Sequence, residues 1–229
     1  MRRLLVLAFA AIGLGGITTA AALADDPARE RASTTRWRVT IENLTPPGPG
    51  APGSQPLSPP LFVVHGAQTD LWSVGGIASH PIAAIAEDAN NAVAEAAFAR
   101  LRGVHDVFTG SGGPIPSGMS RTYTVRTRGG FDRLSVVTML VNTNDGFTGL
   151  DSFRLRGATL EQMAYDAGSE RNNERVAFIP GPCCNNPFVR APEGKLIRMH
   201  RGIAGAHDLD PDVWGWEGPA AKITIEQVG

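Results

Sequence analysis

The sequence has little cysteine, no excess of basic charge and none of the common hydrolase motifs. Its 229 residues include two cysteines. They are adjacent, so no C-x-x-C pair exists and a redox catalytic role is disfavoured. Lysine and arginine number 21 against 22 aspartate and glutamate residues, a balance that disfavours nucleic acid or an anionic membrane as the partner. There is no Gly-x-Ser-x-Gly elbow and no His-Glu-x-x-His helix, so we do not expect an enzyme.

The N-terminus has the pattern of an export signal. Arg2 and Arg3 precede an uncharged apolar stretch over residues 4–22, which ends in small residues. This pattern predicts a secretory signal peptide over residues 1–24, cleaved after Ala24. The alternative is an uncleaved membrane anchor, for which the stretch is short and interrupted by glycine. We expect an exported protein, periplasmic or extracellular, with no membrane span after cleavage.

The rest of the chain is expected to form one domain. Residues 25–35 are polar without periodicity and predict a disordered tail. Residues 36–229 are enough for a single β-sandwich with a sizeable core.

Alternating and β-branched segments predict strands separated by turns rich in glycine and proline. The expected strands are 37–43, 61–65, 120–127, 133–141, 175–179, 196–200 and 221–228. Gly129-Gly130 predicts a hairpin between two of them, and the segment 46–60 predicts a loop. The pattern favours an all-β antiparallel sandwich over a parallel sheet.

One segment, residues 81–102, predicts a helical insertion. Apolar residues recur there at helical spacing, Pro81 stands where a first-turn proline is tolerated, and Gly103 ends the pattern. Asn90-Asn91 marks a point where the helix could divide. We expect it to pack on the sheet.

Two acidic segments, Val141–Asp151 and Tyr165–Glu170, place carboxylates in turn-forming sequence after apolar runs. Oxygen ligands in such loops can converge on Ca²⁺. The spacing is not that of an EF-hand, and the pattern alone also fits a solvated acidic loop. A second cluster, His207–Asp212, fits an exposed turn better than a metal site.

The order of these motifs resembles the spondin N-terminal domain family over about Trp37 to Val228. The motifs are the strand WRVTIENLT from Trp37, the segment QPLSPPL from Gln55, the Ala-rich helix, NTNDGFTG from Asn142, YDAGSE from Tyr165 and AKITI from Ala221.

The resemblance implies an eight-stranded, C2-like antiparallel β-sandwich with a calcium ion held by loop carboxylates at one end. Asp145, Asp166 and Glu170 fall on the family's acidic positions. The chain departs from the family pattern at Glu170, where aspartate is usual, and at Gly146, where an aromatic residue is usual. The remaining oxygens would come from backbone carbonyls, Asn142 or Asn144, Ser169 or water.

Cys183 and Cys184 leave three alternatives: a vicinal disulfide, two free thiols, or bridges to other chains. In each case we expect a rigid kink in the loop 180–192.

We therefore expect an exported, non-enzymatic, Ca²⁺-binding recognition or adhesion module with an extracellular or cell-envelope ligand, either protein or glycan. The alternative is a hydrolase of the cell envelope, metal-dependent or using Asp145, Asp166 or Glu170 as acid and base.

Overall fold

A computed structural model describes residues 34–48 and 53–228. The predicted signal peptide, residues 1–24, lies outside these ranges, as does most of the predicted tail. Thr35, the last residue of that tail, is the first residue of strand β1.

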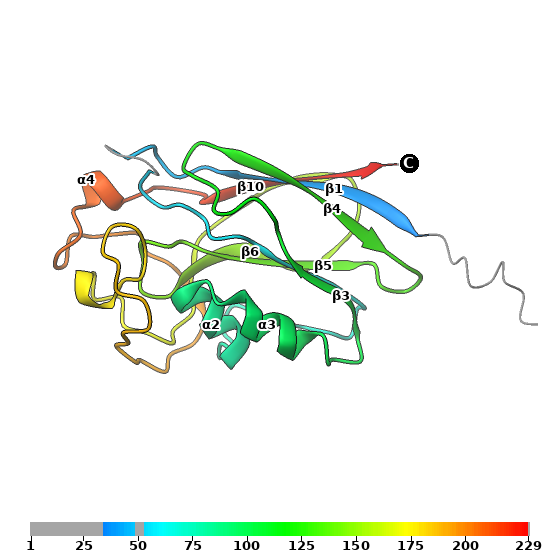
Figure 1. The fold of residues 1–229 in the computed structure, drawn as a ribbon, viewed down its shortest axis with the longest axis horizontal. Helices are drawn as coiled ribbons and strands as arrows, with labels where there is room; N and C mark the ends of the chain where they lie inside the picture. Colours follow the sequence, from blue (N-terminus) through cyan, green and yellow to red (C-terminus); the bar gives the residue numbers. More distant parts are fainter. Residues whose placement is uncertain (1–33, 49–52, 229) are drawn as a thin grey trace, which may run out of the picture. The chain divides into compact units, whose positions relative to one another are not determined.

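Two antiparallel sheets pack face to face (Figure 1). The four-stranded sheet has the order β4 (Ser120–Thr127), β1 (Thr35–Asn43), β10 (Ala221–Val228) and β7 (Ala158–Gln162). The six-stranded sheet has the order β3 (Val104–Thr109), β2 (Leu61–His65), β5 (Arg133–Met139), β6 (Gly146–Arg154), β8 (Tyr165–Asp166) and β9 (Arg198–Met199). The expected all-β antiparallel sandwich is confirmed. The described residues form ten strands where eight were expected, two of them only two residues long.

The four-stranded sheet buries one face. In β1 the buried residues Trp37, Val39 and Ile41 alternate with more exposed polar ones, which is the pattern of a strand with one face in water. Together with Ile223 and Ile225 of β10 they pack into the core between the two sheets.

The six-stranded sheet is covered on both faces. Helices α2 (His80–Asp88) and α3 (Asn91–Phe98) lie against its outer face (Figure 1), where Ile82, Ile85 and Phe98 pack on Leu61 and Val63 of β2. Every residue of β2 is therefore buried, which explains the uninterrupted apolar run over residues 61–64. The expected helical insertion and its division near Asn90 are confirmed. Ala89, in the left-handed region with φ of 54°, ends α2. Within the described ranges no helix is long and apolar enough to cross a membrane.

One strand prediction was wrong and another was right only in part. Residues 175–179 contain a turn of 3₁₀ helix, η1 (Val176–Phe178). Here the side chains of Asn173 and Asp208 accept the backbone N–H groups of Arg175 and Val176, so local hydrogen bonds replace a strand ladder. Of 196–200, only the two residues of β9 are paired as a strand.

The tight turn predicted at Gly129-Gly130 is present, closed by an antiparallel bridge between Arg128 and Phe131, but the two strands that it joins do not pair as a hairpin. The preceding strand β4 pairs with β1, whereas the following strand β5 pairs with β2 and β6. The turn therefore carries the chain from one sheet to the other.

Three longer strands, β3, β6 and β7, were not expected. The most important is β6, because it shortens the acidic loop predicted over 141–151. The loop ends at Asp145 and the strand begins at Gly146. Hydrogen bonds from Thr143 Oγ1 to the Leu140 carbonyl and from Gly146 N–H to Thr143 Oγ1 close this turn at 2.6 and 2.8 Å.

Candidate metal centre

Strand pairing brings the two predicted acidic loops together. Asp145 immediately precedes β6, Asp166 ends β8, and Gly146 is the strand partner of Asp166. The backbone N–H of Ala167 donates to the Asp145 carbonyl at 3.1 Å. The side chains of Asp145, Asp166 and Glu170 are buried, with exposed fractions of 0%, 1% and 1%. They therefore do not form a solvated acidic loop, which was the alternative that the sequence left open.

The turn after β8 wraps around one oxygen of Asp145. Oδ2 accepts hydrogen bonds from the backbone N–H groups of Ser169 and Glu170, both at 2.9 Å, and from Ser169 Oγ at 3.3 Å. Gly168 allows this turn with a φ of +70°. The other oxygen, Oδ1, is buried and accepts no hydrogen bond from the described residues. Burial first, and then the charge of Asp166, raises the pKa of Asp145 to about 7.

The negative charge of Glu170 is compensated even less well than that of Asp145. Both of its carboxylate oxygens are buried without a hydrogen bond from any described residue, although Arg190 Nε lies 3.2 Å from Oε1 as an ion pair. Burial, followed by the charges of Glu87 and Asp145, raises the pKa of Glu170 to about 8. The backbone of Ala191 and the side chain of Asn144 lie close enough to oppose this shift, although neither has the geometry of a hydrogen bond to the carboxylate.

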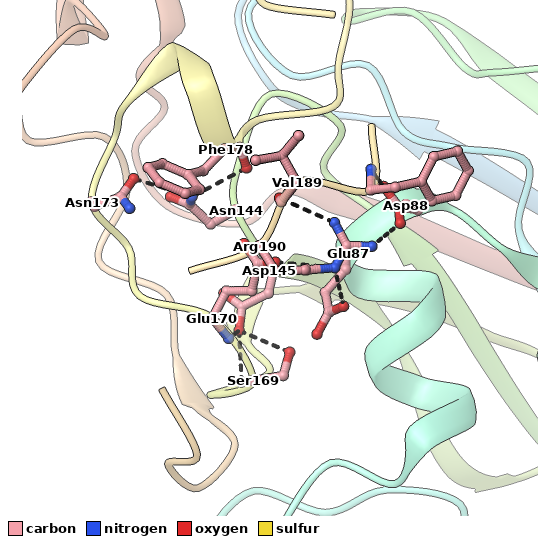
Figure 2. Close-up of polar contacts among 11 residues, drawn as sticks. Glu87, Asp88, Asn144, Asp145, Ser169, Glu170, Asn173, Phe178, Val189 and Arg190 are labelled. Atoms are coloured by element: carbon pink, nitrogen blue, oxygen red, sulfur yellow. Dashed lines mark hydrogen bonds and ion pairs between the residues drawn. The ribbon is translucent and has the colours of Figure 1, made fainter. Parts of the chain in front are cut away.

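Arg190 is the centre of an acidic cluster that the sequence analysis missed. Its guanidinium contacts Glu87, with Nε 2.7 Å from the carboxylate, and also Asp88 and Glu170 (Figure 2). We call Glu87, Asp88, Asp145, Glu170 and Arg190 the acidic cluster. The cluster joins the end of α2, the turn after β8 and the loop 180–192.

A signal for Glu87 and Asp88 was present in the sequence. They occupy the last turn of α2, where acidic side chains oppose the helix dipole. Two acids at that position indicate that something outside the helix compensates them.

Asp166 differs from the other two predicted ligands because both of its oxygens are bonded. Oδ1 accepts from Gly168 N–H at 2.7 Å, and Oδ2 contacts Asn172 Nδ2 at 2.5 Å and Arg198 at 2.6 Å. Burial raises its pKa, while Gly168 and Arg198 oppose that shift. Asp166 thus lies next to Asp145 but is compensated by other residues, Asn172 and Arg198.

The neutral candidate ligands also differ in whether their polar atoms are already used in other contacts. Asn142 is fully buried; its Nδ2 donates to the Ser54 carbonyl at 2.8 Å, and its Oδ1 accepts from Cys183 N–H at 3.1 Å. Its amide is therefore used to hold loops together. Asn144 and Ser169 lie directly beside Glu170 and Asp145.

The cluster at His207–Asp212 is used locally. Asp210 Oδ1 accepts from Asp212 N–H at 2.9 Å and caps the short helix α4 (Pro211–Trp214). Asp208 Oδ2 accepts from Val176 N–H at 3.0 Å. These bonds account for two of the three acids in the turn.

Cys183 and Cys184 are joined to each other by a disulfide, the first of the three alternatives. The bridge lies in the loop 180–192, which is tied to Asn142 through Cys183 N–H and to the acidic cluster through Arg190.

The acidic cluster fits a cation chemically. Buried carboxylate oxygens without hydrogen bonds are costly unless a positive charge compensates them, and Ca²⁺ prefers such oxygens. Over the residues described, no three histidine, cysteine, aspartate or glutamate side chains are arranged to hold a metal by themselves. Ligands other than these side chains would have to complete a coordination shell.

Comparison with known proteins identifies the family. No curated protein matches the chain. A family model described as Spondin_N matches residues 52–171, more than half of the chain and a segment that includes Asp145, Asp166 and Glu170. It covers less than the range over which the sequence motifs show a resemblance. Spondin domains are typically extracellular. The chain belongs to the spondin N-terminal domain family.

Proposed function

We propose that the protein is an exported, non-enzymatic recognition or adhesion module, and that Ca²⁺ bound at the acidic cluster orders its loops. Asp145 and Glu170 would provide the carboxylate oxygens, with Asp166 adding negative charge beside them. The observation that carries this proposal is that Asp145 Oδ1 and both oxygens of Glu170 are buried and accept no hydrogen bond from the described residues.

The electrostatics support a cation at this position. The raised pKa values of Asp145 and Glu170, about 7 and about 8, mean that their ionised forms are poorly stabilised without one. Arg190 supplies a single positive charge to Glu87, Asp88 and Glu170. A divalent ion would supply the missing compensation, with water and neutral oxygens such as those of Asn144 and Ser169 completing the shell.

Burial favours a binding role over hydrolysis. A catalytic acid or base must come within hydrogen-bond reach of its substrate, and Asp145 and Glu170 are 0% and 1% exposed. A hydrolase using these carboxylates would first have to open the turn that surrounds them.

The recognition surface would be the loop that the acidic cluster holds. Phe188 and Val189 are 72% and 42% exposed and directly precede Arg190. The backbone N–H of Phe188 donates to Asp88 Oδ1 at 3.0 Å. Because exposed apolar side chains are typical anchors in interfaces, cation binding at the cluster would order a contact surface for a protein or glycan.

The test is thermal unfolding in EGTA and in excess CaCl₂. At about 100 times the dissociation constant, Ca²⁺ should add about 2.7 kcal/mol, which corresponds to roughly 5–11 °C in Tm for a domain of this size. The variants Asp145→Asn and Glu170→Gln should lose the shift. The exposed residues Asp106 and Glu217 offer matched controls, Asp106→Asn and Glu217→Gln, which should keep it. No shift in the wild type, or the same shift in all variants, would overturn the proposal.

A further inference from the structure

Asp166 also lines a cavity whose lining includes no residue of the acidic cluster. This cavity of about 630 Å³ is bounded by the segment that follows Glu170 and by residues 193–206. Four basic residues line it: Arg171, Lys195, Arg198 and Arg201. This volume falls within the usual range for small-ligand pockets.

The acids in this cavity are already compensated by the protein. Asp166 is bonded to Gly168, Asn172 and Arg198. Glu174 accepts the backbone N–H groups of Ala204 and Ala206 at 2.7 and 2.6 Å.

Glu193, the third acid, is paired with Lys195 and with Arg198, the latter at 3.3 Å. With three acidic and four basic side chains, the lining carries a formal excess of one positive charge.

Two of the basic side chains have no such compensation. Arg171 and Arg201 are exposed, and the structure gives their guanidinium groups no hydrogen bond or ion pair with any residue that it describes. Two unpaired guanidinium groups on one cavity favour a negatively charged ligand, because each can donate a pair of parallel N–H bonds to an oxyanion.

The backbone that carries these arginines is fixed. Arg171 N–H donates to the Ala191 carbonyl at 2.8 Å, and Gly202 N–H donates to His200 Nδ1 at 3.0 Å. Glu174 holds the segment that follows Gly202 through its bonds to Ala204 and Ala206. Both arginines therefore project from anchored segments into a preformed cavity, which reduces the entropy lost on binding.

We propose that this cavity binds the oxyanion group of a small polar ligand, a phosphate, sulfate or carboxylate, and that Arg171 and Arg201 hold it with Lys195 at the edge. The site is separate from the acidic cluster and does not depend on Ca²⁺.

The experiment is an NMR titration of the full domain in EGTA, following backbone amides and arginine Nε–H groups. Sodium phosphate, sodium sulfate and sodium glucuronate are added separately at constant ionic strength, with glucose as the neutral probe. We expect saturable shifts confined to residues 171–174 and 193–206 with at least one anion and none with glucose. Binding of glucuronate alone would identify a carboxylated sugar, whereas binding of phosphate and sulfate would identify a tetrahedral oxyanion.

Variants separate this site from general attraction to positive charge. Arg171→Gln combined with Arg201→Gln should weaken binding by about tenfold or more, since charge-assisted bonds are lost. Arg102→Gln, which changes an exposed arginine elsewhere, should change it by less than about twofold. Because both target side chains are exposed, the double variant is expected to fold, and its amide spectrum checks this. Shifts that fail to saturate, or equal losses in the double variant and in Arg102→Gln, would overturn the proposal.

Discussion

Oδ2 of Asp145 accepts a 2.9 Å hydrogen bond from the backbone N–H of Glu170, whose own buried carboxylate accepts none from the described residues. The bond draws two acidic side chains into one buried volume, and the charge of Asp145 helps to raise the pKa of Glu170. The fold therefore holds two carboxylates where neither is well solvated, and this arrangement determines how the protein should respond to pH, charge removal and cations.

The metal-free protein should lose a stability contribution from this pair as the pH rises from about 4 to about 8. The pKa values of Asp145 and Glu170 are raised from 3.8 and 4.5 to about 7 and about 8. Over this window the folded state binds more protons than the unfolded chain, so unfolding becomes easier as the pH rises. His200 has the opposite effect. Because its pKa is lowered to about 4, its contribution to stability increases as the pH rises from about 4 to the ordinary pKa of histidine.

The measurement therefore compares the free energy of unfolding of Asp145→Asn with that of the wild type, by urea unfolding in EGTA at a series of pH values. Asparagine keeps the acceptor for Ser169 and Glu170 but cannot ionise. The variant should gain stability relative to the wild type as the pH rises. Parallel pH profiles would show that Asp145 does not titrate in this range.

Replacing Arg190 should destabilise the metal-free protein. Arg190→Gln leaves Glu87, Asp88 and Glu170 without their counter-ion, and breaking a buried pair costs about 3–5 kcal/mol. We expect about 3 kcal/mol, because the Arg190 side chain is 27% exposed.

Arg38→Gln is the matched control for that change. It removes an ion pair with Glu226 whose side chains are 53% and 55% exposed, worth about 0–1 kcal/mol. Urea unfolding of the two variants compares the losses directly. Equal losses would mean that the acidic cluster does not need Arg190.

Gly168→Ala should disrupt the turn around Asp145. Gly168 has a φ of +70°, and an added Cβ would lie 2.4 Å from the Lys195 carbonyl oxygen. Gly118→Ala controls for the strain that a positive φ causes in alanine, because Gly118 has a φ of +73° and no atom lies within 4 Å of the added carbon. The control should lose about 1–2 kcal/mol and Gly168→Ala clearly more, measured by thermal unfolding. A smaller loss at Gly168 would contradict the tight packing of this turn.

The disulfide between Cys183 and Cys184 should contribute little to global stability. Disulfide stabilisation grows with the length of the closed loop, and these residues are adjacent. Cys183→Ser combined with Cys184→Ser should therefore lose less than about 1 kcal/mol in thermal unfolding. Mass spectrometry after alkylation should detect no free thiol in the native protein and two after reduction. Two alkylated thiols without reductant would contradict the bridge.

The sequence predicted the sandwich better than its site. Alternation along residues 37–43 and 221–228 reports one buried face per strand, and both segments are strands of the four-stranded sheet. Periodicity was less informative in the six-stranded sheet, where burial on both faces removes alternation.

The acidic cluster depends on long-range contacts that local patterns cannot report. Asp145 and Glu170 lie close together because β6 pairs with β8, and both were named from the sequence. Arg190 meets Asp88 across about a hundred residues of chain, so its role was not predictable. Asp166 is compensated by Arg198, also through a strand pairing that its local sequence does not indicate.

The most direct test is a crystal structure of the domain grown in CaCl₂, with anomalous diffraction to identify the ion. The proposal predicts an ion about 2.3–2.6 Å from Asp145 Oδ1 and from an oxygen of Glu170. Crystals with no ion beside Asp145 Oδ1 and Glu170, and with Arg190 paired to Glu170, would contradict it.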